Sequence, residues 1–348
     1  MAKVTLKDIA RETGMSVAAV SLVLNDRPNK ISAEKRKLIK EVARKKGYVP
    51  NQIARSLVMQ HSQTLGLIVP NIVSPFFSSL ARELEIRCRA CGYALFITNS
   101  DDRSENDLQL VRQLINRGVD GIFLVVASEP PRPELLRTLD TLPVPFLLVD
   151  RVIPSFDCDR IGFDNQQGGY LATRYLLSYG HRRVACIVNT ESNTGVARLA
   201  GYAQALAEKG IELDPGLVLR SAYYISDAYE AARALLATDA TAVFASSDNI
   251  ALGLLKRLYE ENLRVPRDYS VVSYDNSAAD SLFEPALTSI EQNVAELAQG
   301  AIEIMIGRLQ EGAGAGAASA AVDGASSGET ITRVLTPRLV VKASVRRR

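Results

Sequence analysis

The alternation of two kinds of segment after Thr64 constrains the fold of this 348-residue chain more than any other feature. Apolar runs of four or five residues, the length of buried strands, alternate with amphipathic segments of helical length. This pattern predicts parallel sheets with helices on both faces, and seven or more strands divide more naturally into two doubly wound units than into one. The expected strands are 65–69, 94–98, 121–125, 146–149, 184–188, 242–245 and 270–274, and the expected helices lie near 76–91, 104–117, 133–141, 165–179, 196–209, 226–237 and 248–262.

Polar and aromatic residues follow several of these strands at their carboxyl ends. Ligands of doubly wound sheets bind at that edge, and two facing units would form a cleft there. A sugar needs carboxylates and guanidinium groups around its hydroxyls and aromatic rings against its C–H faces. Each residue alone fits a helix cap or a salt bridge equally well, but their common placement favours a ligand site. The set is Ser74, Phe76, Phe77, Asp150, Arg151, Thr194, Arg198, Ser247, Asp248, Asp275 and Gln292.

The first 49 residues have the pattern of three short helices. Thr5 and Ser16 can cap helices over 6–13 and 17–24, and Ser32 can begin a third. The tight turn between the first two predicts a helix-turn-helix. Residues 1–60 carry a net charge of +8 and the remainder −6, which favours a nucleic-acid partner for the first part only. The alternative is an unrelated three-helix bundle with a solvated basic surface.

Two further segments interrupt the folded pattern. Pro50 ends the first part, Asn51 can cap a short helix over 52–58, and the polar stretch 60–63 has the composition of a joint. Residues 312–328 are almost purely small and cannot bury enough apolar area to order themselves. They predict a flexible surface loop before a last strand over 331–341, and the three terminal arginines predict a disordered tail.

The sequence contains none of the common enzyme signatures. It lacks a phosphate-binding loop, a dinucleotide fingerprint, a nucleophile elbow and a zinc-protease motif, and two histidines leave little for acid–base chemistry. Cys88 and Cys91 form a C-x-x-C that ends a helix instead of opening one and has no second ligand pair, so they are interpreted as ordinary helix cysteines. We therefore expect no catalytic residues, no metal and no cofactor.

The chain also lacks the features of a membrane or exported protein. No apolar run approaches the roughly 18 residues of a membrane span, and the N-terminus has no secretory apolar core. Four cysteines fit reduced thiols. The expected location is the cytoplasm.

Three groups of motifs carry a family resemblance across nearly the whole chain apart from 312–328. They are V-T-L-K-D-I-A-R-E-T-G-M-S-V-A-A-V-S-L-V-L-N; then G-Y-V-P-N-Q-I-A-R-S-L; and then R-L-A-G-Y, S-S-D-N-I-A-L-G, V-S-Y-D-N and L-T-S-I-E-Q-N. They resemble the headpiece, the hinge and the effector-binding body of the LacI/GalR family of transcriptional regulators, a body similar to periplasmic sugar-binding proteins. The resemblance implies a helix-turn-helix headpiece at 1–49, a hinge helix and linker at 50–62, and an effector-binding and dimerisation domain of two doubly wound subdomains at 63–348.

The resemblance also implies how such a chain binds DNA. A homodimer would bind a pseudo-palindromic operator, with the second helix in the major groove and hinge helices that form on specific DNA. A hinge leucine, here Leu57, would enter the minor groove and kink it. Many members have a polar or basic residue where this chain has Leu22, so direct hydrogen-bonded readout is expected to be weak and thymine-methyl contacts stronger. The implied DNA-binding residues are Thr5, Ser16, Val17, Ala18, Ser21, Leu22, Asn25, Asn51, Ala54, Arg55 and Leu57.

For the body, the resemblance implies a site for a small effector. The pattern is similar to ribose-type binding proteins, and purine-responsive relatives typically carry an arginine where this chain has Ser192. A monosaccharide such as a pentose is therefore favoured over a nucleobase, while a nucleobase-responsive corepressor-type regulator, a free sugar-binding protein and an α/β enzyme remain alternatives. The implied effector residues are Phe76, Phe77, Asp150, Arg151, Ser192, Thr194, Arg198, Tyr223, Ser247, Asp275 and Gln292.

Overall fold

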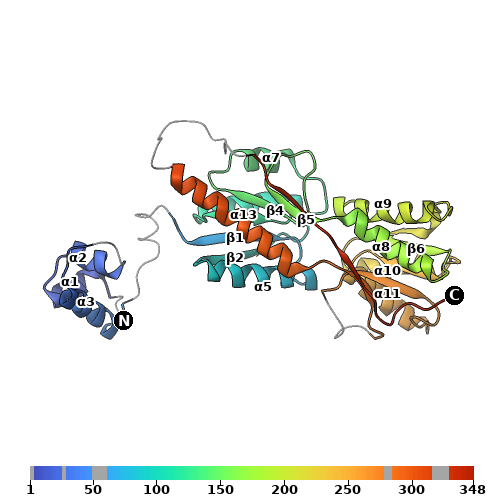
Figure 1. Cartoon of the computed structure of the whole chain (residues 1–348), viewed down its shortest axis with the longest axis horizontal. Helices are drawn as coiled ribbons and strands as arrows, with labels where there is room; N and C mark the ends of the chain where they lie inside the picture. Colours follow the sequence, from blue (N-terminus) through green and yellow to red (C-terminus); the bar gives the residue numbers. More distant parts are fainter. Residues whose placement is uncertain (1–3, 26–28, 49–60, 278–283, 316–328) are drawn as a thin grey trace. The chain divides into compact units, whose positions relative to one another are not determined.

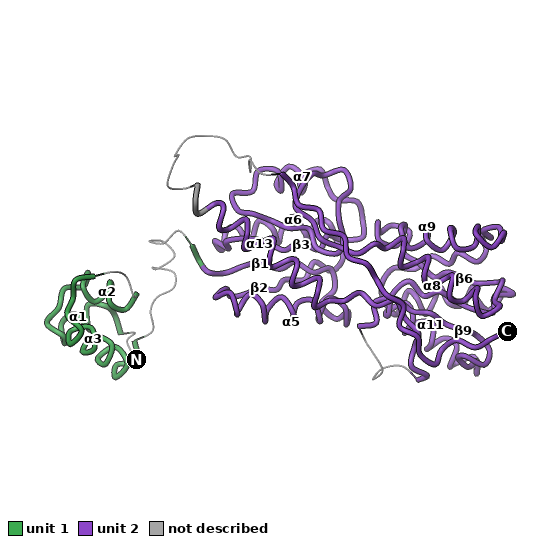
Figure 2. Tube along the Cα trace, in the orientation of Figure 1, with its two compact units in different colours: residues 1–62 green, residues 63–348 purple. Residues whose placement is uncertain are grey.

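The chain divides into two compact units, Met1–Ser62 and Gln63–Arg348 (Figure 2). The computed structural model describes residues 4–25, 29–48, 61–277, 284–315 and 329–348. The predicted hinge segment therefore falls almost entirely outside the described residues, as does 316–328 of the predicted flexible loop.

The described residues of the first unit form three short helices, as predicted, and side-chain caps set where the first two begin. In a capping box, the Thr5 hydroxyl accepts from the Asp8 amide and the Asp8 carboxylate accepts from the Thr5 amide. Ser16 caps the second helix by accepting from the amide of Ala19. Gly14, with φ of +66°, makes the tight turn between them, so the helix-turn-helix is confirmed. The helices are α1 (Leu6–Thr13), α2 (Val17–Leu24) and α3 (Ala33–Lys45).

One small core holds these helices together. Ile9 of α1, Val20 of α2 and Ile39 of α3 are fully buried at its centre. These positions recur at helical spacing with Ala10, Val23, Val42 and Ala43, so each helix turns one apolar stripe inward.

In the part of the second unit that the structure describes, the strands form two six-stranded sheets, which we call the N-lobe sheet and the C-lobe sheet (Figure 1). The N-lobe sheet has the order β11-β5-β4-β3-β1-β2, and the C-lobe sheet has the order β12-β10-β9-β8-β6-β7. The N-lobe strands are β1 (Thr64–Val69), β2 (Ala94–Asn99), β3 (Gly121–Leu124), β4 (Phe146–Val149), β5 (Arg160–Phe163) and β11 (Thr332–Leu335). The C-lobe strands are β6 (Val184–Val188), β7 (Val218–Arg220), β8 (Ala242–Ala245), β9 (Ser270–Asp275), β10 (Thr288–Glu291) and β12 (Arg338–Val340).

Helices cover both faces of each sheet, as the alternating sequence pattern predicts. In the N-lobe, α5 and α13 pack on one face and α6 and α7 on the other; in the C-lobe, α10 and α11 pack on one face and α8 and α9 on the other. The N-lobe helices are α5 (Pro75–Ala90), α6 (Ser104–Asn116), α7 (Pro133–Asp140) and α13 (Val294–Ala315). The C-lobe helices are α8 (Asn165–Ser178), α9 (Asn193–Ala207), α10 (Ile225–Leu235) and α11 (Asp248–Glu260).

The C-terminal part of the unit differs from the sequence prediction. The single last strand expected over 331–341 is two strands, β11 in the N-lobe sheet and β12 in the C-lobe sheet, and β12 runs antiparallel to β10. Pro337 lies between them, so a continuous strand would lose a ladder hydrogen bond there. The helix α13 was not predicted, and it continues to Ala315, four residues into the segment 312–328.

The expected disordered tail is also wrong. The Arg346 amide donates to the Ser270 hydroxyl at 3.1 Å, and the Arg348 amide donates to the Tyr179 carbonyl at 3.0 Å. The buried His181 ring lies within 3.1 Å of the Arg346 carbonyl and 2.9 Å of the Ser270 hydroxyl. The tail is therefore tied to the C-lobe around a buried histidine.

Candidate functional site

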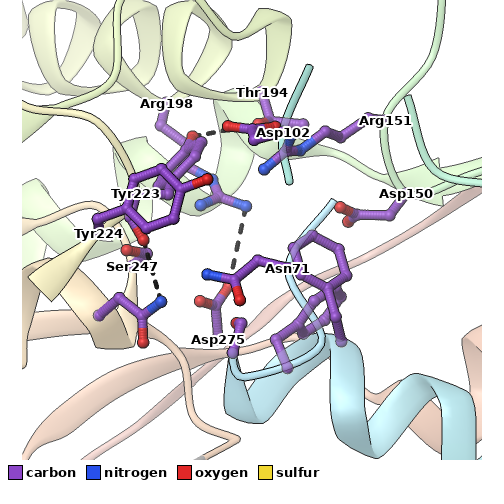
Figure 3. Close-up of a pocket in the computed structure, with 14 residues that line it drawn as sticks. Asn71, Asp102, Asp150, Arg151, Thr194, Arg198, Tyr223, Tyr224, Ser247 and Asp275 are labelled. Carbon is purple, nitrogen blue, oxygen red and sulfur yellow. Dashed lines mark hydrogen bonds and ion pairs between the residues drawn. The ribbon is translucent and has the colours of Figure 1, made fainter. Parts of the chain in front are cut away.

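A cavity of about 490 Å³ lies in the second unit, and residues from both lobes line it (Figure 3). The lining residues come from the loops at the carboxyl ends of the strands and from the N-terminal one or two turns of α5, α9 and α11. They are Asn71, Ser74, Phe76, Phe77, Asp102, Asp150, Arg151, Thr194, Arg198, Tyr223, Tyr224, Ser247, Asn249 and Asp275.

Two buried aspartates occupy matching places in the two lobes. Asp150 directly follows β4 and Asp275 ends β9, and each of these strands is third in its sheet from the end that carries β11 or β12. Both residues have a left-handed backbone, with φ of +63° and +88°, which aspartate tolerates better than most side chains. The doubly wound topology therefore brings one carboxylate from each lobe to the same cavity.

The guanidinium of Arg198 lies with these carboxylates and donates three hydrogen bonds within the protein. Its Nε donates to Asn165 Oδ1 at 2.8 Å, Nη1 to the Ser246 carbonyl at 2.6 Å and Nη2 to Gln292 Oε1 at 2.9 Å. Nη2 also lies 3.9 Å from Asp275 Oδ1, and this ion pair is drawn in Figure 3. Arg198 thus fixes the positions of groups from several elements of the C-lobe.

Arg151 forms a second buried ion pair on the N-lobe side. Its Nη1 donates to Asp102 Oδ1 at 2.6 Å, and its guanidinium lies 5.3 Å from the ring centre of Phe77 and 5.2 Å from that of Tyr223. Asp102 also accepts from the Ser128 amide and hydroxyl. The charge of Arg151 is therefore balanced by Asp102, and its flat face is stacked between aromatic rings from both lobes.

Hydrogen bonds join the lobes around the cavity. The Tyr224 hydroxyl donates to the Asp101 carbonyl at 3.2 Å, and Asn189 Nδ2 donates to Ser128 Oγ at 3.3 Å. Gln292 links Asp150 to Arg198, because its Nε2 donates to Asp150 Oδ1 at 3.3 Å while its Oε1 accepts from Arg198.

Burial changes the acidity of the two equivalent carboxyl groups. Desolvation raises the pKa of Asp275 to about 7, partly offset by the positive charge of Arg198. Desolvation also raises the pKa of Asp150, and the charges of Arg198 and Arg151 oppose this shift. Each carboxyl group therefore lacks the solvation that a donor from a ligand would replace.

Most of the effector residues that the sequence indicates do line this cavity. Phe76, Phe77, Asp150, Arg151, Thr194, Arg198, Tyr223, Ser247 and Asp275 are among the lining residues. Ser192 and Gln292 do not line it; the Ser192 hydroxyl is buried against Thr194 Oγ1 at 2.8 Å, and Gln292 supports Arg198.

Sequence reasoning missed four lining residues, Asn71, Asp102, Tyr224 and Asn249, whereas Ser74, which it placed after the first strand, does line the cavity. Asn71 follows β1 in the same loop as Ser74 and the two phenylalanines, and Asn249 follows Ser247 by two residues, so the strand-end rule that found their neighbours would also find these two residues. Asp102 follows β2, and nothing in the sequence near it signals its pairing with Arg151.

The residues that the resemblance assigns to DNA lie on the first unit as far as the structure describes them. Ser16, Val17, Ala18 and Leu22 are exposed on α2, and Ser21 is half-buried. Asn25 donates to the Ser21 carbonyl at 2.8 Å beyond the end of the helix, and Thr5 caps α1. Asn51, Ala54, Arg55 and Leu57 lie outside the described residues.

Within the described residues, no group of three or more histidine, cysteine, aspartate or glutamate side chains is arranged to hold a metal ion. Searching that same part of the chain finds no helix that is both long and apolar enough to cross a membrane.

Both units match families of known proteins. Residues 5–51 match the family of bacterial regulatory proteins of the lacI type, and residues 62–326 match the family of periplasmic binding proteins and sugar-binding domains of LacI regulators. The HTH-type transcriptional repressor PurR of Pasteurella multocida is 31% identical over 99% of both chains. The ribose operon repressor of Escherichia coli is 33% identical over 88% of this chain and 93% of its own.

A solved structure agrees with these sequence relatives. A LacI-family transcriptional regulator from Enterococcus faecium with bound ribose has a TM-score of 0.70 and 28% identity, over 81% of this chain and 98% of its own. The sequence relatives are transcriptional repressors, so the prediction that this chain is not an enzyme is confirmed. The chain belongs to the LacI family of bacterial transcriptional regulators.

Proposed function

We propose that this protein is a cytoplasmic transcriptional repressor that binds a DNA operator as a homodimer and changes its operator affinity when a small molecule enters the cleft. One observation carries the proposal: a single chain combines a basic helix-turn-helix unit with a body whose cavity is lined from two lobes. Such a cavity couples ligand binding to the relative position of the lobes, which is what an allosteric regulator requires.

The DNA site in this proposal is the exposed face of α2 together with the predicted hinge segment, residues 50–62, at the end of the first unit. The residues in the major groove are Ser16, Val17, Ala18, Ser21 and Leu22, with Thr5 and Asn25 near the backbone. Asn51, Ala54 and Arg55 belong to the hinge, and Leu57 enters the minor groove and kinks the centre of a pseudo-palindromic operator.

The effector in this proposal is a monosaccharide, with a pentose favoured. Asp150 and Asp275 offer acceptors to hydroxyl groups from opposite lobes, and Phe76, Phe77 and Tyr223 supply apolar rings for the C–H face. The ribose named for two similar proteins supports the same class of ligand.

A purine base is the second candidate, and the name of the PurR relatives favours it. Against it, the resemblance gives purine-responsive relatives an arginine where this chain has Ser192. That serine is buried and hydrogen-bonded to Thr194, so it brings no cation to the cavity.

A gel-shift titration on DNA upstream of the protein's own gene tests this function. The full chain is titrated with and without pentoses, hexoses and purine bases. We expect retardation of that DNA over random DNA, and a change in its affinity with one sugar. Equal retardation of both DNAs contradicts the repressor, whereas a response to a purine alone contradicts the sugar and keeps the repressor.

A further inference from the structure

Gln63, the first residue of the second unit, has an unfavourable backbone conformation that its surroundings hold in place. Its φ is +53°, in the left-handed region that few residues other than glycine, asparagine and aspartate adopt, and its side chain is exposed. Its amide donates to Asp120 Oδ2 at 2.8 Å, and its carbonyl accepts from the Ala94 amide at 2.9 Å. A strained residue persists where its surroundings over-determine it, and here hydrogen bonds fix the backbone on both sides of Gln63.

Asp120 holds this position from 57 residues away in the sequence. It stands between α6 and β3, and only 7% of its surface is exposed. Its own amide donates to the Thr64 carbonyl at 2.8 Å, so its side chain and its backbone bond to two successive residues of the chain. The pairing of β1 with its neighbours begins at Thr64, and the Asp120 carboxylate therefore extends the fixed part of the chain by one residue, to Gln63.

Two strands join this position to the cavity. β1 begins next to Gln63 and leads to the loop that carries Asn71, which lines the cavity. β3 begins next to Asp120 and leads to Ser128, whose hydroxyl accepts from Asn189 of the C-lobe. The two strands pair in parallel inside the N-lobe sheet, so they move as one body. The position of Gln63 therefore follows the N-lobe and not the segment that precedes it.

We propose that Asp120 is a positioning residue for operator binding: it fixes the point from which the hinge segment leaves the N-lobe, and so limits the half-site spacings that the homodimer accepts. This inference rests on the proposed function, since it assumes a dimer on two half-sites. Release of Gln63 adds one residue of slack in each protomer, up to about 3.5 Å. One added base pair lengthens the operator by roughly the same 3.4 Å, so this slack is large enough to matter.

Operators of altered spacing test the inference on the full chain. The starting duplex is an operator selected from random duplexes, and two others have one base pair more or one fewer between the half-sites. Fluorescence anisotropy gives the spacing penalty, which is the Kd for an altered duplex divided by the Kd for the selected one. To bind an altered duplex the unchanged protein must break the bond between Gln63 and Asp120. We therefore expect Asp120→Ala to lower the penalty at least about tenfold, the lower end for a hydrogen bond to a charged group.

Two matched pairs of variants separate positioning from a loss of stability. Asp120→Asn keeps a side-chain oxygen that accepts from the Gln63 amide, so it keeps the penalty that Asp120→Ala loses. Gln63→Pro removes the donor and cannot adopt a positive φ, so it lowers the penalty, whereas Gln63→Asn keeps the amide, tolerates the left-handed backbone and leaves the penalty unchanged. Because the penalty is a ratio within one variant, a smaller folded fraction cancels from it. If Asp120→Ala does not fold, the two Gln63 variants decide.

Three results overturn the inference. The first is a penalty that neither Asp120→Ala nor Gln63→Pro changes, and the second is an equal reduction by Asp120→Ala and Asp120→Asn. The third is equal binding of all three duplexes by the unchanged protein, which would place the slack elsewhere in the chain and leave the repressor function standing. If no duplex is preferred over random DNA, the proposed function fails and the inference fails with it.

Discussion

Asp275 is a buried residue whose environment opposes its own charge. Burial raises its pKa from 3.8 to about 7, so the folded protein favours the protonated form. The stabilisation from this proton is complete below the lower value and is lost as pH rises through the higher one. A side chain of similar shape that cannot ionise, such as asparagine, keeps its contribution to the free energy of unfolding at every pH.

The substitution Asp275→Asn therefore has opposite effects on stability and binding. One pH unit above the raised pKa, the free energy of unfolding rises by about 1 kcal/mol or more, because the buried charge is gone. Effector affinity falls by about ten- to a hundredfold, because a charge-assisted acceptor becomes a neutral one. Urea melts across the pH range and calorimetry measure the two effects.

Asp140→Asn serves as the control and changes neither quantity, since Asp140 is exposed on α7. A variant with unchanged stability above pH 7 would mean that Asp275 is ionised without penalty, and the account of its burial would be wrong.

At this scale the sequence predicts part of the site. Asp150 and Asp275 are predictable, because each stands at the carboxyl end of an apolar run and topology alone brings such ends to one edge. Asp102 and Tyr224 are not, since the Asp102–Arg151 pair and the Tyr224–Asp101 contact join segments whose proximity depends on how the chain crosses between sheets.

The packing of α8 against α9 positions the site at the scale of elements. A Cβ on Gly169 would lie 2.0 Å from the Arg198 carbonyl oxygen, and one on Gly201 would lie 1.9 Å from the Gln166 carbonyl oxygen. Only glycine permits this approach of the two backbones, and Arg198 lies in the segment that the contact positions.

We predict that Gly169→Ala weakens effector binding at a distance from the cavity. The added methyl group pushes α9 away and lowers the free energy of unfolding by roughly 1–3 kcal/mol, as in other overpacked sites. Effector affinity falls with it, because Arg198 shifts. Thermal melts and calorimetry provide the two readouts.

Gly307→Ala, in α13, is the matched control. A Cβ there meets nothing within 4 Å, so the higher helix propensity of alanine stabilises this variant by up to about 1 kcal/mol. Equal changes in the free energy of unfolding and in effector affinity for the two variants would show that the contact between α8 and α9 does not position the site.

The element α2 predicts how the operator is read. From Val17 to Leu24 it carries no charged side chain, and Val17, Ala18 and Leu22 are exposed. Side chains of this kind contact the thymine methyl group and form no hydrogen bonds with base edges.

Replacing thymine by deoxyuridine in each half-site of an operator selected from random duplexes should therefore weaken binding, by about 1–3 kcal/mol for a contacted position. The same replacement outside the half-sites is the control, and fluorescence anisotropy gives the affinities. Unchanged binding after every replacement would show that the exposed apolar face of α2 does not read methyl groups.

The sequence predicts a helix or strand well where local residues determine it, and poorly where the element packs against segments that are distant in the sequence. The three helices of the first unit can be predicted from the sequence, because Thr5, Ser16 and Ser32 cap them. The helix α13 could not be predicted in this way, because it follows a C-lobe strand yet packs on the N-lobe sheet, and its C-terminal residues are small.

At the scale of the whole molecule, the two lobes of the second unit are joined by connections of the chain as well as by the cavity that both of them line. The chain passes between the two sheets after β5, after β10 and after β11, so three connections constrain how one lobe moves against the other (Figure 1). A ligand that binds both lobes thus biases one concerted movement, and its effect on DNA depends on its difference in affinity between the two positions.

Reciprocal coupling is the prediction that tests the molecule as a whole. If the effector changes operator affinity by some factor, about 5–150 in typical allosteric proteins, the operator must change effector affinity by the same factor. Anisotropy titrations of operator with saturating effector give the first factor, and calorimetry of effector with saturating operator gives the second. Residues 63–348 alone, a compact unit by themselves, bind effector with an affinity that operator leaves unchanged. Unequal factors in the full chain, or an operator effect on the isolated body, would mean that DNA and effector do not act through one linked equilibrium between the two units.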